Sequence, residues 1–256
     1  MNTPIDISEE AGVRYLHFGS DWVQGAMRIR KPDALELAYT REMMAGLLLR
    51  DGLAEDTGRW PKKVLIIGLG AASLAKFVYR HCPQARIRVV EIAPTVVAAA
   101  RQFFKLPAED ARFSIHVGCG AQYVLEKDET WDYILVDGFD RNARAGALDT
   151  LPFYQAVRSR LSGQGLMAVN LFGRSRGYKA SVERLLKAFD DRVVAFPSCD
   201  SGNVVAFAAD GEAIERPLAE LRERARLLKT TTGLDLGPTI TRLEQSGSVP
   251  GGSLRL

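Results

Sequence analysis

A glycine-containing loop is the first feature of this 256-residue chain whose residue types could do chemistry. Residues 64–73 read VLIIGLGAAS, in which an apolar run leads through Gly68 and Gly70 into a helical pattern. Glycines at such a turn let the backbone approach a ligand closely, and the first N–H groups of the helix point toward it. Ser73 stands where a third glycine of the dinucleotide-binding fingerprint would be. The loop is therefore a candidate cofactor site, with a purely structural turn as the alternative.

A carboxylate follows at the distance that a nucleoside site requires. Glu91 ends the next apolar run, about twenty residues beyond the glycines, where a carboxylate can accept hydrogen bonds from both ribose hydroxyls of an adenosine. Ile92, directly after it, is included in the candidate site. The alternative for Glu91 is a solvated residue at a strand end. We expect an adenosine co-substrate, either a nicotinamide dinucleotide or a sulfonium nucleoside.

Two further acids lie in residues 131–140, WDYILVDGFD. Asp137 ends an apolar run, and Asp140 comes three residues later. Open α/β sheets bind ligands at the carboxyl ends of their strands, next to the point where the strand order reverses. A lone Asp after a strand is usually a turn residue or a helix cap, whereas a pair in this place favours a functional role.

The elements that must position these residues alternate regularly between strand and helix. Apolar runs predict strands at 64–67, 87–91, 112–117, 133–137 and 166–171, with helices at 71–81, 95–105, 122–126, 153–161 and 178–189. This alternation predicts an α/β fold with a parallel sheet covered on both faces. The last two strands, 193–196 and 204–208, are joined by a link too short for a crossover helix, so they should be antiparallel. That ending favours the sulfonium nucleoside over the dinucleotide.

Three regions are predicted along the chain. Residues 1–58 form a small N-terminal β region, with strands at 13–18 and 22–29, and a helix at 35–50. Residues 59–232 form the nucleotide-binding α/β domain, and 233–256, rich in Gly, Ser, Thr and Pro, should be a loosely ordered tail. Because a sheet this small leaves edges and an apolar face exposed, we expect it to mediate a homodimer.

Composition excludes several classes of protein. The formal net charge of +3 is spread along the chain and favours neither nucleic acid nor a membrane surface as a partner. Three cysteines and three histidines are scattered without metal-ligand spacing, so no metal is expected. No apolar run reaches the roughly 18 residues of a membrane span. The first residues are acidic where a signal peptide would be basic and then apolar, so we expect a cytoplasmic protein.

Six segments, in this order, resemble the spermidine/spermine synthases, which are polyamine aminopropyltransferases: HFGSDWVQGAM, ELAYTREMM, VLIIGLG, VVEI, HVGCG and WDYILVDGFD. The resemblance covers about residues 13–210. It implies an S-adenosylmethionine-dependent methyltransferase-like (Rossmann-type) sheet with a terminal antiparallel strand. The co-substrate would be decarboxylated S-adenosylmethionine, whose aminopropyl group passes to a small amine such as putrescine, releasing methylthioadenosine. The sulfonium carries its own activation, so this chemistry needs no metal.

The resemblance also implies roles for individual residues. The co-substrate would be bound by Gly68, Gly70, Ser73, Glu91, Ile92, Cys119 and Gly120. The acceptor would be bound by Asp140, Tyr39 and Gln24, and Asp137 would be the catalytic aspartate. A carboxylate in that place can hold the attacking amine, accept its proton and aim its nitrogen at the carbon beside sulfur.

Several positions depart from the family pattern. Ala71 stands where the family has the Asp that holds the aminopropyl ammonium, so we expect weak discrimination between decarboxylated and intact S-adenosylmethionine. Cys119 replaces the acid of the adenine segment. Arg141 and Arg144 follow Asp140, and two cations would repel a diamine. Two alternatives therefore stay open: a methyltransferase that uses intact S-adenosylmethionine, and a non-catalytic nucleoside-binding relative.

Overall fold

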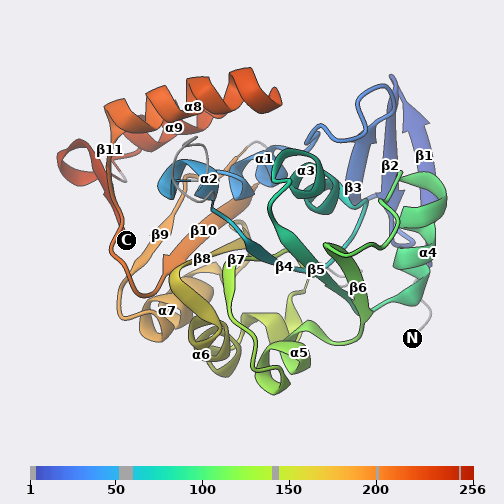
Figure 1. Cartoon of the computed structure of the whole chain (residues 1–256), viewed down its shortest axis with the longest axis horizontal. Helices are drawn as coiled ribbons and strands as arrows, with labels where there is room; N and C mark the ends of the chain where they lie inside the picture. Colours follow the sequence, from blue (N-terminus) through green and yellow to red (C-terminus); the bar gives the residue numbers. More distant parts are fainter. Residues whose placement is uncertain (1–3, 52–59, 140–143, 200–201, 248) are drawn as a thin grey trace.

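The computed structural model describes residues 4–51, 60–139, 144–199, 202–247 and 249–256 (Figure 1). Asp140 and Arg141 lie outside the described residues, so their predicted roles stay predictions.

A seven-stranded sheet with the order β6-β5-β4-β7-β8-β10-β9 forms the centre of the molecule (Figure 1). Its strands are β4 (Lys63–Ile67), β5 (Arg86–Glu91), β6 (Phe113–Val117), β7 (Trp131–Val136), β8 (Leu161–Phe172), β9 (Val193–Ala195) and β10 (Asn203–Ala209). Strands β4 to β8 pair in parallel, and β10 is antiparallel to both β8 and β9. The predicted fold class, with its terminal antiparallel strands, is confirmed. Because β4 is followed by β5 on one side and flanked by β7 on the other, the strand order reverses between β4 and β7.

Helices cover both faces of this sheet (Figure 1). One core packs the sheet against α1 (Ala38–Met43), α2 (Gly46–Leu49), α3 (Ser73–His81), α4 (Pro94–Phe103), α8 (Leu218–Thr232) and α9 (Gly237–Gln245). The other packs it against α5 (Gly120–Glu126), α6 (Leu151–Ser159) and α7 (Tyr178–Ala188), with the short 3-10 turn η1 (Gly146–Asp149) ahead of α6. Strand β4 is apolar throughout because Val64 and Ile66 face the first core while Leu65 and Ile67 face the second.

The N-terminal region is a three-stranded antiparallel sheet of β1 (Asp6–Glu10), β2 (Val13–His17) and β3 (Val23–Arg28). Strand β1 was not predicted, because its sequence DISEE lacks the β-branched and aromatic pattern of a strand. The sheet packs on the loop before α3: a Cβ built on Gly25 would lie 2.6 Å from the Cβ of Ala71. Glycine in β3 therefore permits a contact that any side chain would block. The helix predicted at 35–50 is divided into α1 and α2.

The C-terminal segment contradicts the expectation of a loosely ordered tail. Helix α9 and the 3-10 turn η2 (Pro250–Gly252) are followed by β12 (Ser253–Arg255), which pairs with β11 (Glu215–Pro217). Leu236 and Ile240 are at most 2% exposed, as are Leu228 of α8 and Leu243 of α9. Their apolar burial is what orders the segment, although its many small residues conceal the helical period.

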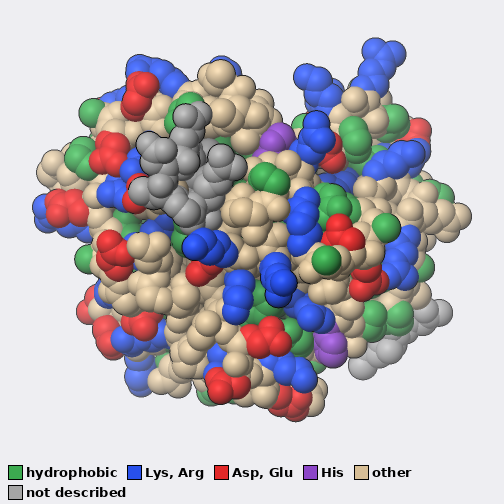
Figure 2. Space-filling model, viewed as in Figure 1, with side chains coloured by type: hydrophobic (Ala, Val, Ile, Leu, Met, Phe, Trp, Pro, Cys, Tyr) green, Lys and Arg blue, Asp and Glu red, His purple; other side chains and the backbone are tan. Residues whose placement is uncertain are grey.

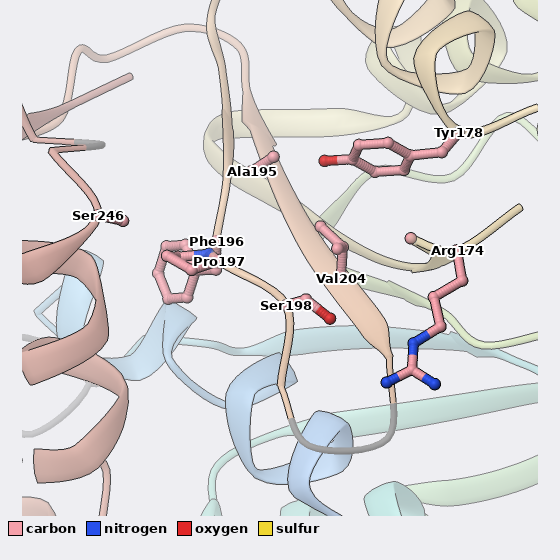
Figure 3. A pocket seen from close by; sticks show the side chains of 9 residues that line it. Arg174, Tyr178, Ala195, Phe196, Pro197, Ser198, Val204 and Ser246 are labelled. Carbon is pink, nitrogen blue, oxygen red and sulfur yellow. The ribbon is translucent and has the colours of Figure 1, made fainter.

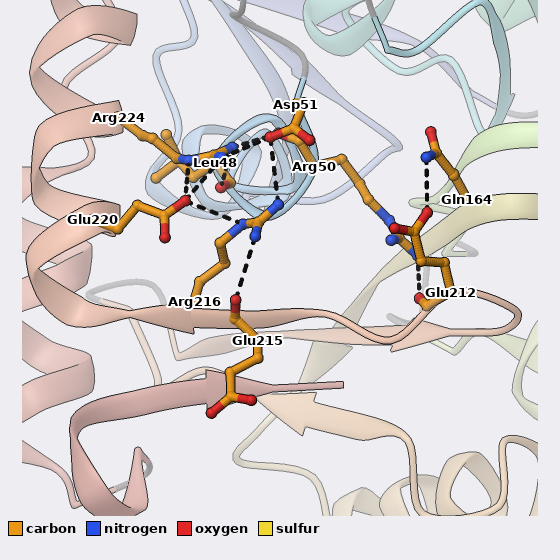
Figure 4. A network of polar contacts seen from close by, with 9 residues as sticks. All are labelled: Leu48, Arg50, Asp51, Gln164, Glu212, Glu215, Arg216, Glu220 and Arg224. Atoms are coloured by element: carbon orange, nitrogen blue, oxygen red, sulfur yellow. Dashed lines mark hydrogen bonds and ion pairs between the residues drawn. The ribbon is translucent and has the colours of Figure 1, made fainter. Parts of the chain in front are cut away.

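A polar network attaches α8 and β11 to the end of α2 (Figure 4). Arg224 of α8 donates to the Asp51 carboxylate at 2.6 Å and to the Arg50 carbonyl oxygen at 2.9 Å. Arg216 of β11 reaches the same Asp51 oxygen at 3.4 Å. The carbonyl of Glu212 accepts from the Arg50 guanidinium at 2.8 Å. These contacts hold α8 over the α1–α2 pair, which in turn carries Tyr39.

On the face seen in Figure 2, basic and acidic side chains are interspersed over most of the surface, and several basic ones lie close together near its middle. Within the described part of the chain, no helix has the length and apolar character needed to cross a membrane.

Candidate active site

A cleft of about 1280 Å³ opens where the carboxyl ends of the parallel strands meet, beside the reversal between β4 and β7. Its walls come from β3, α1, the loops after β4, β5, β6 and β7, and the ends of β8 and β10. Small-molecule pockets usually occupy roughly 300–1,000 Å³. The cleft therefore has room for a nucleoside and a second small molecule beside it.

The glycine loop lines the cleft with Gly68, Leu69 and Gly70. Gly68 has a φ of +95°, and a Cβ there would lie 2.1 Å from the carbonyl oxygen of Asp137. Only glycine lets the loop after β4 touch the backbone after β7. The Asp137 N–H in turn donates to the Ile67 carbonyl at 2.8 Å. The loop and the predicted catalytic residue are thus held together by the backbone.

Glu91 lines the cleft and also braces the loop. Its Oε2 accepts from the Leu69 N–H and its Oε1 from the Ala93 N–H, both at 2.8 Å. Burial raises the pKa of Glu91, while the backbone hydrogen bonds from Ala93, Leu69 and Ile92 lower it in part. Each carboxylate oxygen still has a lone pair for a ligand hydroxyl. Glu91 can therefore hold the loop and a ribose at once.

Three further residues predicted to bind the co-substrate lie beyond Glu91. Ile92, Cys119 and Gly120 all line the cleft, and the Ile92 side chain is 70% exposed. An isoleucine side chain with this much exposed surface gives that end of the cleft an apolar wall.

Two residues just after the glycines do not face the cleft. The Ser73 hydroxyl donates to the Ala26 carbonyl of β3 at 3.0 Å, and Ser73 is not a lining residue. Ala71 is 2% exposed and packs against the N-terminal sheet with Leu16 and Met27. Because the chain turns toward β3 as α3 begins, the structure places both side chains outside the lining of the cleft, and their roles toward the co-substrate stay predictions.

Asp137 lies half-buried at the middle of the cleft and accepts two side-chain hydrogen bonds. The Tyr39 hydroxyl donates to its Oδ2 at 3.2 Å, and Asn170 Nδ2 donates to its Oδ1 at 2.9 Å. Burial raises the pKa of Asp137, and these two bonds lower it in part. Burial and the Asp137 charge together raise the pKa of Tyr39 well above its usual value, so Tyr39 stays a donor.

A second amide fixes the orientation of Asn170. Asn203 Nδ2 donates to Asn170 Oδ1 at 2.9 Å, which leaves the amide nitrogen of Asn170 for Asp137. Neither asparagine was proposed as a site residue from the sequence. The available signal was a polar residue in the otherwise apolar run 166–171, and the antiparallel pairing of β8 with β10 brings the two together.

The far end of the cleft, over β8 and β10, is lined by aromatic residues and a cation. The rings of Trp22 and Phe172 lie 5.8 Å apart between centroids, and Arg174 lies just beyond the end of β8. Gln24 and Arg144 also line the cleft, and the acceptor role of Gln24 stays a prediction.

The sequence profile of the spermine/spermidine synthase domain matches residues 36–171. A polyamine aminopropyltransferase of Chromobacterium violaceum is 37% identical over 250 residues, which cover 98% of this chain and 93% of the relative. The chain belongs to the spermine/spermidine synthase family. Enzymes so named are transferases, so the prediction of a transferase is confirmed.

Two solved structures show which folds this member of the spermine/spermidine synthase family shares. Human methyltransferase-like protein 13, in complex with SAH, has a TM-score of 0.66 and 29% identity, covering 77% of this chain and 93% of that chain. A spermidine synthase in complex with the transition-state analogue AdoDATO has a TM-score of 0.58 and 25% identity, and the match covers 81% of this chain and 74% of that chain.

Some residues that line the cleft lie within the range that matches the family domain, and others lie outside it. Tyr39, Gly68, Glu91, Asp137 and Asn170 all lie inside the matched residues 36–171. The lining residues of β3, the end of β8 and the start of β10 lie outside it: Trp22, Gln24, Phe172, Arg174 and Asn203.

Proposed function

We propose that this protein is an aminopropyltransferase that moves the aminopropyl group of decarboxylated S-adenosylmethionine to an amine and releases methylthioadenosine. The observation that carries the proposal is the Asp137 carboxylate, which is held by Tyr39 and Asn170 at the middle of a cleft whose one end has the features of a nucleoside site. The family match supports the same reaction.

The co-substrate would lie at the β5 end of the cleft. Glu91 would accept hydrogen bonds from the ribose hydroxyls, and the exposed Ile92 side chain would cover one face of the adenine. Cys119 and Gly120 would line its edge. Because the glycine loop touches the backbone of Asp137, a nucleoside on this loop would have its sulfur side toward that carboxylate.

The acceptor amine must lose a proton before it attacks. An alkylamine with a pKa of about 10.4 costs roughly 4–5 kcal/mol to deprotonate at pH 7. Asp137 would hold the ammonium and take its proton, and its raised pKa makes it a better proton acceptor than an exposed carboxylate. The amine nitrogen then forms a bond to the aminopropyl carbon beside sulfur. That carbon–sulfur bond breaks, and its electron pair returns to the sulfur as a neutral thioether.

The products decide between this reaction and methyl transfer. Purified protein is incubated with decarboxylated S-adenosylmethionine and an amine, and separately with intact S-adenosylmethionine and the same amine. We expect methylthioadenosine in the first mixture, in amounts equal to the aminopropylated amine. Release of adenosylhomocysteine in the second mixture, with no methylthioadenosine in the first, would show a methyltransferase instead.

We also propose that the N-terminal sheet forms a homodimer. Strand β1 pairs only with β2 among the described strands, and Ile29, directly after β3, is 39% exposed. Light scattering of the intact protein should give the mass of two copies, and Ile29→Lys should shift it toward one. An intact protein with the mass of a single copy would contradict the dimer. A cytoplasmic location stays a prediction.

A further inference from the structure

The two sides of Asp137 differ in charge. On the β5 side the cleft presents the Glu91 carboxylate. On the β8 and β10 side, the described lining residues include no carboxylate, and their one charged group is the Arg174 guanidinium. The described lining of the whole cleft contains two arginines, Arg144 and Arg174, and two acids, Glu91 and Asp137. An acceptor that extends from Asp137 away from the nucleoside therefore meets a cation.

Arg174 is placed to meet a ligand. It follows β8 directly and lies against Gly202, where a Cβ would come 2.8 Å from its Nε. Figure 3 shows its side chain running past Val204 and away from Tyr178. Its side chain is exposed, and it makes no hydrogen bond or ion pair with any residue of the described part of the chain. All five guanidinium N–H donors are thus available.

The described residues at this end of the cleft fit a diamine poorly. With one nitrogen at Asp137, its second ammonium would lie toward Arg174 without a described carboxylate to neutralise it. A carboxylate in that place would instead form a paired, two-point contact with the guanidinium. The rings of Trp22 and Phe172, with centroids 5.8 Å apart, offer an apolar surface for the methylenes between the two groups.

We propose that the acceptor is an amine that carries a carboxylate, such as an ω-amino acid, and that Arg174 binds this carboxylate. The proposal rests on the proposed function, since it assumes that the acceptor nitrogen lies at Asp137. It gives Arg174 the role of a specificity-determining residue.

Two probes of equal chain length separate the possibilities: putrescine and 4-aminobutanoate, which differ only in the group at one end. Each is titrated by calorimetry into the protein saturated with methylthioadenosine. We expect wild type to bind 4-aminobutanoate more tightly. Arg174→Gln should weaken that binding by about fivefold, the size of an exposed charge pair. Arg174→Glu should reverse the preference. Arg176→Gln is the matched control, because Arg176 is exposed on the same loop but does not line the cleft.

Three results would overturn the proposal: equal or tighter binding of putrescine by wild type, an unchanged preference in Arg174→Glu, or binding of neither probe. A carboxylate could also come from intact S-adenosylmethionine. If Arg174→Gln weakens intact S-adenosylmethionine and leaves 4-aminobutanoate unchanged, Arg174 serves the co-substrate and the proposal fails. Because these titrations need no turnover, their outcome is separate from methylthioadenosine release, which tests the proposed function itself.

Discussion

The two ends of the cleft are built in different ways. The nucleoside end comes from the turns after β4, β5 and β6, close together in the chain, and its shape is set by backbone contacts around Gly68 and Glu91. The acceptor end gathers Trp22, Arg174 and Asn203 from distant segments outside the family match. Backbone contacts between neighbouring turns therefore fix the nucleoside end, whereas the acceptor end depends on side chains that tertiary packing brings together.

Asp137 lies between the two ends, so its loss should have the largest effect. Asp137→Asn removes the proton acceptor while keeping the shape of the side chain, and we expect kcat to fall by about 10³-fold, within the range of general-base catalysis. Methylthioadenosine should bind to the variant as it does to wild type. A variant that retains most of its turnover would show that another group takes the proton.

A change at the nucleoside end should affect only that end. Glu91→Gln replaces one carboxylate oxygen by an NH2 group, which cannot accept a hydrogen bond. One of the two bonds from Leu69 and Ala93 is then lost, together with the charge that faces the ribose, so both the loop and the ribose contact are weakened. We expect methylthioadenosine affinity to fall by about tenfold or more, as for charged hydrogen bonds of roughly 1.5–3 kcal/mol. Calorimetry measures it, and circular dichroism confirms that the variant is folded. An unchanged affinity would place the nucleoside elsewhere.

Replacing Asn170 should change how kcat depends on pH. Because its hydrogen bond lowers the pKa of Asp137, Asn170→Ala should raise that pKa further. Asp137 must be ionised to accept a proton, so kcat falls as pH drops through its pKa, and this fall should move to higher pH in the variant. Asn203→Ala, which acts through Asn170, should move it less in the same direction. A profile that does not move in either variant would show that the amides have no role in tuning Asp137.

Lys76 offers a change that should leave both ends of the cleft untouched. It is 2% exposed in α3, donates to the Phe104 carbonyl at 2.8 Å, and burial lowers its pKa to about 7. Between about pH 7 and 10.5 the unfolded chain holds the extra proton, so wild-type stability should rise with pH there. Lys76→Met should abolish this rise and stabilise the protein at pH 6 by about 1–3 kcal/mol, after the lost hydrogen bond is counted. Urea unfolding at several pH values measures it, and wild-type stability that is flat over this range would contradict it.

The sequence predicted the nucleoside end of the cleft better than the acceptor end. The apolar run at 64–67, the glycines and Glu91 belong to neighbouring elements, so local spacing placed them correctly. Local spacing could not show that the side chains of Ala71 and Ser73 lie against β3, because the direction in which α3 leaves the loop depends on packing against a strand about fifty residues earlier.

Other features depend on pairing that local patterns do not reveal. The hydrogen bond between Asn170 and Asn203 requires β10 to lie against β8 in one register. The tail was misjudged because its small residues conceal a helix whose stability comes from burial of Leu236, Ile240 and Leu243. In both cases tertiary contacts, rather than local propensity, decide the structure.

The central claim is that the nucleoside and the acceptor lie on opposite sides of Asp137. A crystal structure with methylthioadenosine and 4-aminobutanoate tests it most directly. The account predicts ribose hydroxyls on Glu91, the sulfur facing Asp137, the acceptor nitrogen on the Asp137 carboxylate, and the acceptor carboxylate toward Arg174. A nucleoside lying over β8 and β10, with Glu91 free of the ribose, would contradict it.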